Sequence, residues 1–358
     1  MSAPSRTASR VAALSFLLAL GACAPRPVTR PEPPTAPTPA APAPASYAEH
    51  PAYPAFRARM AAQRFDGAAL DALFEQVAPD QRVLDAMARP AESKPWHQYR
   101  RIFVTAERIA LGARFWDEHA AKVERAAEAY GVDPEIVVAI IGVETKYGTI
   151  MGKFPVISSL ATLAFDYPSR ATFFTDELEQ FLLMTRELGL DPLTPVGSYA
   201  GAMGAGQFMP SSYRSYSRDG DDDGARNLWT DWDDITASVA NYFKRSGWVR
   251  GAPVEVPAVL REGAVEPARA SALTLTTVGE LRGAFVFSAG VADADEALFV
   301  ALDTEQGRVH SVGLHNFWVI TRYNRSPLYA MAVSELAREI VAARAAVPGS
   351  TASSLVSD

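Results

Sequence analysis

The segment from residue 132 to residue 148, VDPEIVVAIIGVETKYG, constrains the fold more than any other part of the chain. Asp133 and Pro134 are typical of the first positions of a helix, and Gly148 is typical of the residue that ends one. Between them the predicted helix, residues 134–147, is apolar on nearly every side, so we expect it to be buried. Burial requires a shell of other elements, which a chain of 358 residues with 48% hydrophobic residues can provide.

One carboxylic acid lies on an apolar face of this predicted helix. Glu144 follows Val137 by seven residues, Ile140 by four and Ile141 by three, so it shares their face in the last turn. Burial disfavours the charged carboxylate and raises its pKa, which is the property that a general acid needs near neutral pH. A structural glutamate that pairs with a distant arginine, or that caps backbone amides, fits the same periodicity. The pattern alone leaves both interpretations open.

The N-terminus has the features of an export signal. Two arginines, Arg6 and Arg10, precede an apolar run of ten residues, 11–20, which is too short to span a bilayer. The following Leu-Gly-Ala-Cys resembles the bacterial lipobox, so we predict a lipoprotein signal peptide over residues 1–22 and lipidation of Cys23. The alternative is an ordinary secretory signal. Since Ala24 rather than aspartate follows the cysteine, the resemblance favours the periplasmic face of a Gram-negative outer membrane.

Composition divides the rest of the chain into a tether, a folded region and a tail. Residues 23–54 are rich in proline and alanine and predict an extended linker, whereas the polar residues 348–358 predict a disordered tail. Between them, residues 55–347 have mostly helical periodicity, with β-type runs between residues 273 and 323 and a hairpin turn at 305–307. The predicted helices are residues 56–64, 66–77, 95–107, 110–130, 134–147, 155–164, 170–188, 236–246 and 328–345. The fold class is therefore mainly α with a small β part.

Charge and cysteine content exclude several functions. Cys23 is the only cysteine, so an intramolecular disulfide and cysteine-ligated metal centres are excluded. The net charge of −7 argues against nucleic acid as a partner.

A glycine-rich segment, residues 197–212, suits the binding of a sugar. Its sequence is GSYAGAMGAGQFMPSS, and its glycines allow backbone amides to approach a ligand closely. Gln207 offers a hydrogen-bond donor and acceptor, and Phe208 offers a ring face for stacking. The order of residues does not match a phosphate-binding loop.

Four motifs resemble those of the membrane-bound lytic murein transglycosylase B family, which is family 103 of the glycoside hydrolases, and they occur in the same order as in that family. They are IIGVET at 140–145, GAMG-x-GQFMPSSY at 201–213, SVANYF at 238–243 and ITRYN at 320–324. The resemblance extends from about residue 56 to residue 345. It implies a lysozyme-like catalytic core with additional helices, and peptidoglycan glycan strands as substrate.

The resemblance also assigns chemistry to residues. Glu144 would be the single acid/base that cleaves the β-1,4 bond between N-acetylmuramic acid (MurNAc) and N-acetylglucosamine (GlcNAc), leaving 1,6-anhydro-MurNAc ends without a cofactor. The implied substrate-binding residues are Ser198, Gln207, Phe208, Tyr242, Tyr323 and Asn324. One alternative is a hydrolytic muramidase, which would use two carboxylates. A second alternative is a glycan-binding scaffold lipoprotein without catalysis.

An acidic loop at residues 219–234 matches the beginning of an EF-hand. Acids occupy positions 1, 3 and 5, a glycine occupies position 6, and Ala225 would offer its carbonyl at position 7. Position 12 is Thr230 rather than glutamate, and the family resemblance implies a later closing acid, Asp234, with Asp233 as the alternate. The predicted ligands of a structural Ca²⁺ are Asp219, Asp221, Asp223, Ala225 and Asp234. The other interpretation is a solvated acidic turn.

Overall fold

The computed structural model describes residues 45–88, 94–267, 273–287 and 290–346. The predicted signal peptide, Cys23, most of the predicted linker and the predicted tail lie outside these residues. Within them, no helix combines the length and the apolar character that crossing a membrane requires.

The described chain begins with four short helices, of which α2 and α3 are capped by aspartates. They are η1 (Tyr47–Glu49), α1 (Tyr53–Ala62), α2 (Gly67–Phe74) and α3 (Gln81–Met87). The Asp66 carboxylate accepts a hydrogen bond from Ala69 N at 2.8 Å and so caps α2. Tyr47 is fully buried, and its hydroxyl donates to Asp166 Oδ2 at 2.6 Å and lies 3.0 Å from Thr162 Oγ1. The folded region thus begins by Tyr47, earlier than the predicted residue 55, because this aromatic side chain packs into the core.

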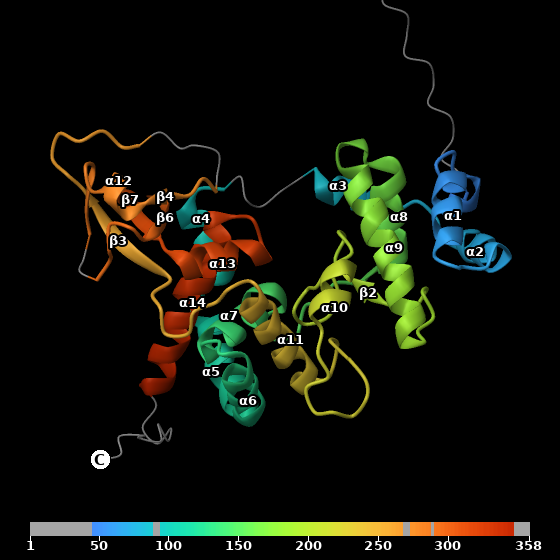
Figure 1. Ribbon diagram of the computed structural model, residues 1–358, viewed down its shortest axis with the longest axis horizontal. Coiled ribbons are helices and arrows are strands. Elements are labelled where there is room, and N and C mark those ends of the chain that lie inside the picture. The colour runs from blue at the N-terminus through green and yellow to red at the C-terminus, as the bar shows by residue number, and fades with distance from the viewer. Residues whose placement is uncertain (1–44, 89–93, 268–272, 288–289, 347–358) are drawn as a thin grey trace, which may run out of the picture. The chain divides into compact units, whose positions relative to one another are not determined.

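A second group of elements leads to the glycine-rich segment. Helices α8 (Val156–Asp166) and α9 (Ala171–Leu188) lie side by side, and the short strands β1 (Phe154–Pro155) and β2 (Val196–Gly197) pair next to them (Figure 1). Helix α10 (Pro210–Tyr216) follows the glycine-rich segment and packs on α9. Gly189, with φ of 66°, ends α9 in the left-handed conformation that glycine adopts without strain.

The central helix of the largest core is α7 (Pro134–Thr145), as its apolar sequence predicts. Its neighbours are α5 (Ala106–Glu118), α6 (Ala120–Tyr130), α11 (Trp232–Arg245) and α14 (Pro327–Ala345). Helix α14 also packs on α4 (Trp96–Phe103) and α13 (His315–Tyr323). The buried side chains of α7 run from Ile136 to Val143, with Thr145 also buried, so the prediction of a buried helix is confirmed.

The prediction of one helix over residues 110–130 is wrong, because the chain turns at His119. His119 has φ of −116° and ψ of 22°, which interrupts the helical hydrogen bonds between α5 and α6. Its ring packs against Phe115 and Trp232, with ring centroids 4.7 and 5.2 Å away. This packing brings the two short helices around α11, and it outweighs an unbroken helical periodicity.

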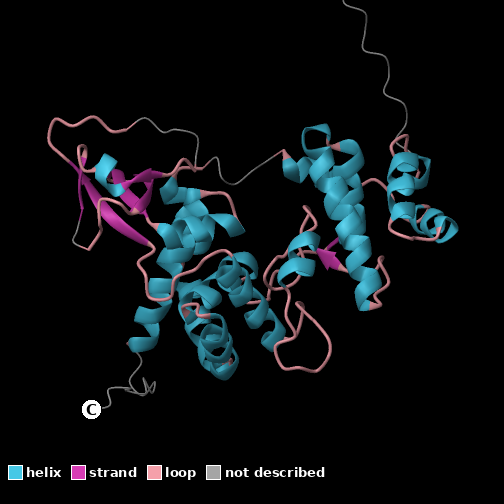
Figure 2. Ribbon diagram, in the orientation of Figure 1, coloured by secondary structure: helices cyan, strands magenta, loops and turns pink. Residues whose placement is uncertain are grey.

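The strands outside β1 and β2 form one five-stranded antiparallel sheet in the order β4-β6-β7-β3-β5. Figure 2 draws strands in magenta, and this sheet lies at the left of the view. Its strands are β3 (Glu255–Leu260), β4 (Thr276–Thr277), β5 (Phe285–Phe287), β6 (Glu296–Thr304) and β7 (Gly307–Gly313). The β6–β7 hairpin turns where the sequence predicts it, and Gly307 adopts φ of 122°. A small core on one face of the sheet includes residues of α12 (Val278–Leu281).

The β region begins and ends at other residues than the sequence predicts. Strand β3 lies before residue 273, and α13 occupies the end of the stretch that was expected to be β-type. The residues of α13 are rich in β-branched and aromatic types, which favour strands locally. They form a helix because the apolar face of Phe317 and Ile320 is buried in the main core.

Candidate active site

The carboxylate of Glu144 is enclosed by protein at the end of α7 but keeps partial exposure to solvent. Tyr329, near the start of α14, donates a hydrogen bond of 2.5 Å from its hydroxyl to Glu144 Oε1. Burial raises the pKa of Glu144 to about 7, and the Tyr329 hydrogen bond opposes that rise. At neutral pH the group therefore exists in both protonation states, which suits a residue that first donates and then accepts a proton.

The structural interpretation of Glu144 has no support in its surroundings. Among the described residues, neither an arginine nor a backbone amide donates to its carboxylate. Lys146, two residues along the chain, points elsewhere and donates to Glu107 at 2.6 Å. The carboxylate of Glu144 is left with one neutral hydrogen-bond partner.

The chain leaves α7 through three successive residues with positive φ. Lys146, Tyr147 and Gly148 have φ of 50°, 60° and 79°, so the helix ends at Thr145 and not at residue 147. The Tyr147 ring fills the space that two glycines leave open: a Cβ at Gly112 or Gly142 would lie 2.3 or 2.5 Å from its phenol oxygen. This fit holds the strained turn directly behind Glu144.

The start of α7 is held by a contact from another part of the chain. Asp133 occupies the predicted N-cap position, but its carboxylate makes no capping hydrogen bond within α7. It accepts from Trp248 Nε1 at 2.9 Å and from Gly251 N at 3.1 Å. Asp133 thus fixes α7 against the segment that follows α11.

The glycine-rich segment forms a tight loop whose tip is tied to two residues of the Glu144 site. Met203 and Phe208 exchange two backbone hydrogen bonds of 2.9 Å at its base. At its tip, Ala205 O accepts from Thr145 Oγ1 at 2.8 Å. The next carbonyl, Gly206 O, accepts from the hydroxyl of Tyr323 at 2.5 Å. The loop tip is therefore fixed against the end of α7 and against α13.

Most of the predicted substrate-binding residues lie on this loop or on the helices that hold it. Ser198 is partly exposed, and its Oγ accepts from Ala200 N and Ala202 N at 3.3 and 3.0 Å. Gln207 has φ of 51° and donates through Nε2 to Met151 O and Gly204 O. The side-chain amide nitrogen of Gln207 therefore stabilises the loop through these hydrogen bonds.

The aromatic members of the predicted set form a packed cluster rather than open faces. Phe208 is 2% exposed, and its ring contacts those of Tyr242 and Tyr323 at 6.1 and 5.8 Å between centroids. The prediction that Phe208 offers a stacking face is therefore wrong, because both neighbouring rings cover it. Tyr242 and Tyr323 keep partial exposure, as does Asn324, which ends α13.

Tyr329 and Thr145 are site residues that sequence reasoning missed. Tyr329 lies in the first turn of α14, which Ser326 caps by accepting from Tyr329 N at 3.3 Å. Nothing in the local pattern indicates contact with a residue 185 positions away. Thr145, by contrast, directly follows Glu144 in the motif, and its adjacency was the only available signal.

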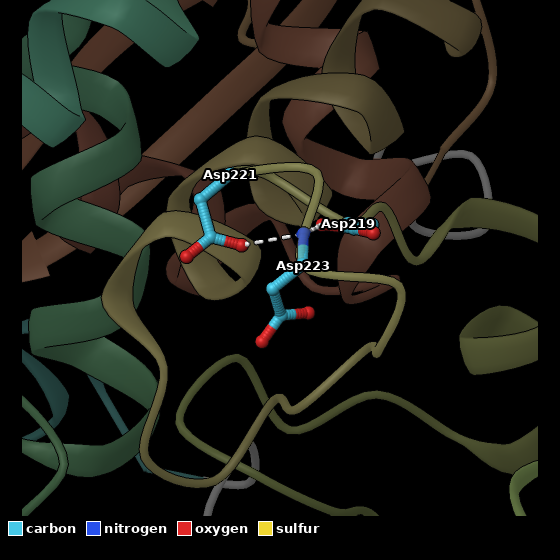
Figure 3. A group of neighbouring side chains, drawn as sticks. All are labelled: Asp219, Asp221 and Asp223. Atoms are coloured by element: carbon cyan, nitrogen blue, oxygen red, sulfur yellow. Dashed lines mark hydrogen bonds between the residues drawn. The ribbon is translucent and has the colours of Figure 1, made fainter.

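Three carboxylates of the acidic loop converge, as Figure 3 shows. Carboxylate oxygens of Asp219, Asp221 and Asp223 all lie within 4.8 Å of one another. Backbone amides already orient all three: Asp219 accepts from Gly224 N at 2.8 Å, Asp221 from Asp223 N at 3.3 Å, and Asp223 from Ala225 N at 2.7 Å. Hard oxygen ligands at this spacing suit Ca²⁺.

Asp234 closes the loop through hydrogen bonds to both of its arms. It is 1% exposed, and its two oxygens accept from Gly220 N at 2.7 Å and Asn227 N at 2.6 Å. It does not belong to the converging cluster. The alternate, Asp233, forms ion pairs with Lys122 and Arg125 of α6, and one of its carboxylate oxygens also lies within 4.8 Å of oxygens of Asp221 and Asp231.

The comparisons with known proteins agree with this architecture. The family model described as "Transglycosylase SLT domain" matches residues 48–338. The chain is 43% identical to the membrane-bound lytic murein transglycosylase B of Escherichia coli K12 over 271 residues, which are 74% of each protein.

Solved structures of similar proteins have the same fold. The catenated lytic transglycosylase SltB1 of Pseudomonas aeruginosa is 46% identical, with a TM-score of 0.78 over 83% of this chain and 99% of that one. The Escherichia coli lytic transglycosylase Slt35, solved in complex with calcium, is 40% identical, with a TM-score of 0.76 over 83% and 95%. The helical fold and the enclosed glutamate beside a glycine-rich loop thus define a lysozyme-like glycan-cleaving class. The chain belongs to the lytic transglycosylase family.

Proposed function

We propose that this lytic murein transglycosylase uses Glu144 as its single acid/base residue. The protonated carboxyl donates its proton to the glycosidic oxygen between MurNAc and GlcNAc as the bond from that oxygen to C1 breaks. The carboxylate then takes the proton of the MurNAc 6-hydroxyl, whose oxygen attacks C1 and closes the 1,6-anhydro ring. Glu144 is protonated again at the end, and no water is consumed.

The surroundings of the Glu144 carboxylate carry this proposal. Its pKa of about 7 results from burial and one tyrosine hydrogen bond, and no carboxylate among the described residues contributes to that shift. A hydrolytic glycosidase would place a second carboxylate across the bond to activate water or to act as a nucleophile. This environment, together with the similarity to a protein named as a lytic murein transglycosylase, favours attack by the substrate's own hydroxyl over the muramidase alternative.

The loop and its neighbours would hold the glycan at Glu144. The hydroxyl of Ser198, a partly exposed residue, and the carbonyl oxygen of Gln207 would hydrogen-bond the sugar next to the cleaved bond. Tyr242 and Tyr323 would line the cleft with their ring edges, since their hydroxyls donate to Arg322 O and Gly206 O. Asn324 would contribute its side-chain amide at the end of α13.

The N-terminal sequence and one relative support attachment to a membrane. The similar Escherichia coli protein is named membrane-bound. Lipidation of Cys23 after removal of residues 1–22 would anchor this chain to the periplasmic face of the outer membrane, with residues 24 to about 45 as the tether. Replacing Cys23 with serine should release the protein from the membrane fraction, and unchanged fractionation would contradict the anchor.

The acidic loop would hold a structural Ca²⁺ ion. The converging carboxylates of Asp219, Asp221 and Asp223 supply oxygen ligands, and a similar protein was solved with calcium. Ala225 would add its carbonyl, and Asp234 would shape the loop. The ion has no part in the acid/base steps above.

Product analysis of two glutamate variants tests the catalytic proposal. Purified peptidoglycan is digested with the wild type, with Glu144→Gln and with Glu135→Gln, and the released muropeptides are analysed by mass spectrometry. Glu135 is a suitable control because it lies on the same helix, is partly exposed and also has a pKa raised by burial. We expect anhydro products, one water lighter than reducing ends, from the wild type and Glu135→Gln only. Reducing ends alone, or activity of Glu144→Gln, would overturn the proposal.

A further inference from the structure

The hydroxyl group of Thr145 is buried where α7 meets the glycine-rich loop. Its side chain is 1% exposed, and three backbone groups surround its Oγ1. Gly148 N donates to it at 3.0 Å, and the carbonyls of Ala205 and Ile141 lie at 2.8 and 3.2 Å. A hydroxyl has one hydrogen to donate, and the shorter contact with Ala205 O takes it.

This hydrogen bond joins two segments that are distant in the sequence, since Thr145 and Ala205 are 60 residues apart. On one side it holds the residue next to Glu144 and the turn of positive φ that follows. On the other side it holds the tip of the loop. Other hydrogen bonds of the tip join Ala205 N to Leu228 O at 2.8 Å, the Tyr323 hydroxyl to Gly206 O, and Gln207 Nε2 to Met151 O.

The loop tip carries the residue that is proposed to bind the sugar. Gln207 is two residues beyond Ala205, and its backbone N–H donates to Gly204 O at 3.1 Å within the same tip. Moving Ala205 would therefore move Gln207 relative to Glu144. It would also open the space beside Glu144 to water, because Gly206 holds the Tyr323 ring that shares this site.

We infer that Thr145 is a positioning residue of the transglycosylase reaction, whose hydroxyl sets the distance between Glu144 and the substrate-binding loop. This inference rests on the proposed role of Glu144. Thr145 does not touch the reacting atoms. It acts by holding the loop tip against the end of α7. This contact keeps water away from Glu144 and keeps Gln207 at a fixed position relative to Glu144.

Two substitutions separate the hydroxyl from the shape of the side chain. Thr145→Val keeps the volume and removes the hydrogen bond, whereas Thr145→Ser keeps the hydroxyl and removes the methyl group. Thr185→Val is the matched control, because Thr185 is equally buried but its hydroxyl donates within its own helix, to Leu182 O at 3.1 Å.

The first measurement is the pH dependence of peptidoglycan cleavage. We expect Thr145→Val to lower kcat by about tenfold, which corresponds to the loss of about 1.4 kcal/mol of transition-state stabilisation. The upper limb of its pH profile should move to lower pH, because water that reaches Glu144 favours the charged carboxylate. Thr145→Ser and Thr185→Val should keep the wild-type profile. A wild-type profile for Thr145→Val would overturn the inference, and so would equal loss in Thr145→Ser.

The second measurement does not depend on activity. Hydrogen exchange of the amides of residues 203–208 is followed in the Glu144→Gln background, with and without Thr145→Val. We expect faster exchange in the loop when the hydroxyl is absent, and unchanged exchange would contradict the inference. If Glu144→Gln itself retains cleavage, the proposed role of Glu144 fails, whereas a silent Thr145→Val beside an inactive Glu144→Gln refutes only the role of Thr145.

Discussion

The Tyr329 hydroxyl donates a 2.5 Å hydrogen bond to Oε1 of Glu144 from a helix that lies 185 residues further along the chain. Tyr329 is itself 2% exposed and sits in the first turn of α14. Burial alone would raise the pKa of Glu144 further, and this hydrogen bond opposes the rise by stabilising the carboxylate. The pair thus sets the pKa of Glu144 close to neutral pH. It also leaves the other carboxylate oxygen open to the substrate.

Replacing Tyr329 with phenylalanine should raise the pKa of Glu144, because the hydrogen bond that stabilises its charged form is lost. The upper limb of the pH–rate profile should therefore move to higher pH. We expect kcat to fall by about tenfold, since an unrestrained carboxyl group spends less time in the reactive orientation. Tyr53→Phe is the control, because Tyr53 makes a similar hydrogen bond of 2.8 Å to Asp71 within the N-terminal helices. An unshifted profile for Tyr329→Phe would show that the contact has no influence on the acid.

The stability of the protein should depend on pH through the titration of Glu144. Its pKa is about 7 in the folded state and near 4.5 when it is unfolded, so the folded state binds more protons between these values. Its contribution is fully present below about pH 4.5 and is lost as the pH rises through about 7. Glu144→Gln should therefore be more stable than the wild type at about pH 8, by on the order of 1–2 kcal/mol after allowing for partial exposure.

Denaturant unfolding at about pH 5 and about pH 8 measures this difference. Glu107→Gln should change stability in the opposite direction, because the Lys146 partner lowers the pKa of Glu107, whose stabilising effect is present at neutral pH and lost in acid. If Glu144→Gln gives the same difference from the wild type at both pH values, the raised pKa of Glu144 is wrong.

The sequence predicts most of what depends on local patterns. The buried helix around Glu144, the hairpin at Gly307 and the convergence of the acidic loop all follow from periodicity, turn chemistry or ligand spacing. Tyr329 could not be predicted in the same way, because its role depends on how α14 packs on α7. The covering of Phe208 by two tyrosine rings is likewise a tertiary result.

Helix limits failed where distant contacts override the local signal. His119 interrupts an otherwise continuous helical pattern because its ring packs against Trp232 of α11. The predicted start of α7 is confirmed, although the Asp133 carboxylate accepts from Trp248 Nε1 and Gly251 N rather than from α7. Motifs therefore locate the chemistry of this chain, and packing decides which atoms of each motif are available.

Gly204 should tolerate no side chain, because the loop tip lies against the chain at Leu228. It has φ of 70°, and a Cβ there would lie 2.3 Å from Leu228 O. Gly204→Ala should lower both activity and stability, the latter by more than the ~1–2 kcal/mol of left-handed strain alone. Gly189→Ala is the matched control, with φ of 66° and no atom within 4 Å of its Cβ. Equal melting temperatures of the two variants would contradict the close approach at Leu228.

The acidic loop should respond to two kinds of substitution in different ways. Asp221 is exposed and belongs to the converging cluster, whereas Asp234 is buried and bonds both arms of the loop through Gly220 N and Asn227 N. Asp221→Asn should leave the melting temperature in chelator unchanged and reduce the increase that Ca²⁺ produces. Asp234→Asn should lower the melting temperature with and without Ca²⁺, because an amide group would face a backbone donor, at a cost of about 1–3 kcal/mol.

Thermal unfolding of the wild type and both variants, in chelator and in millimolar Ca²⁺, distinguishes these effects. An ion that binds only the folded loop stabilises the protein by mass action, so the wild-type melting temperature should rise with Ca²⁺ concentration. Mg²⁺ should produce a smaller rise, because it requires a tighter octahedral set of ligands than these flexible carboxylates provide. If Ca²⁺ leaves the wild type unchanged while Asp234→Asn still destabilises it, the loop is a solvated acidic turn whose closure depends on Asp234 alone.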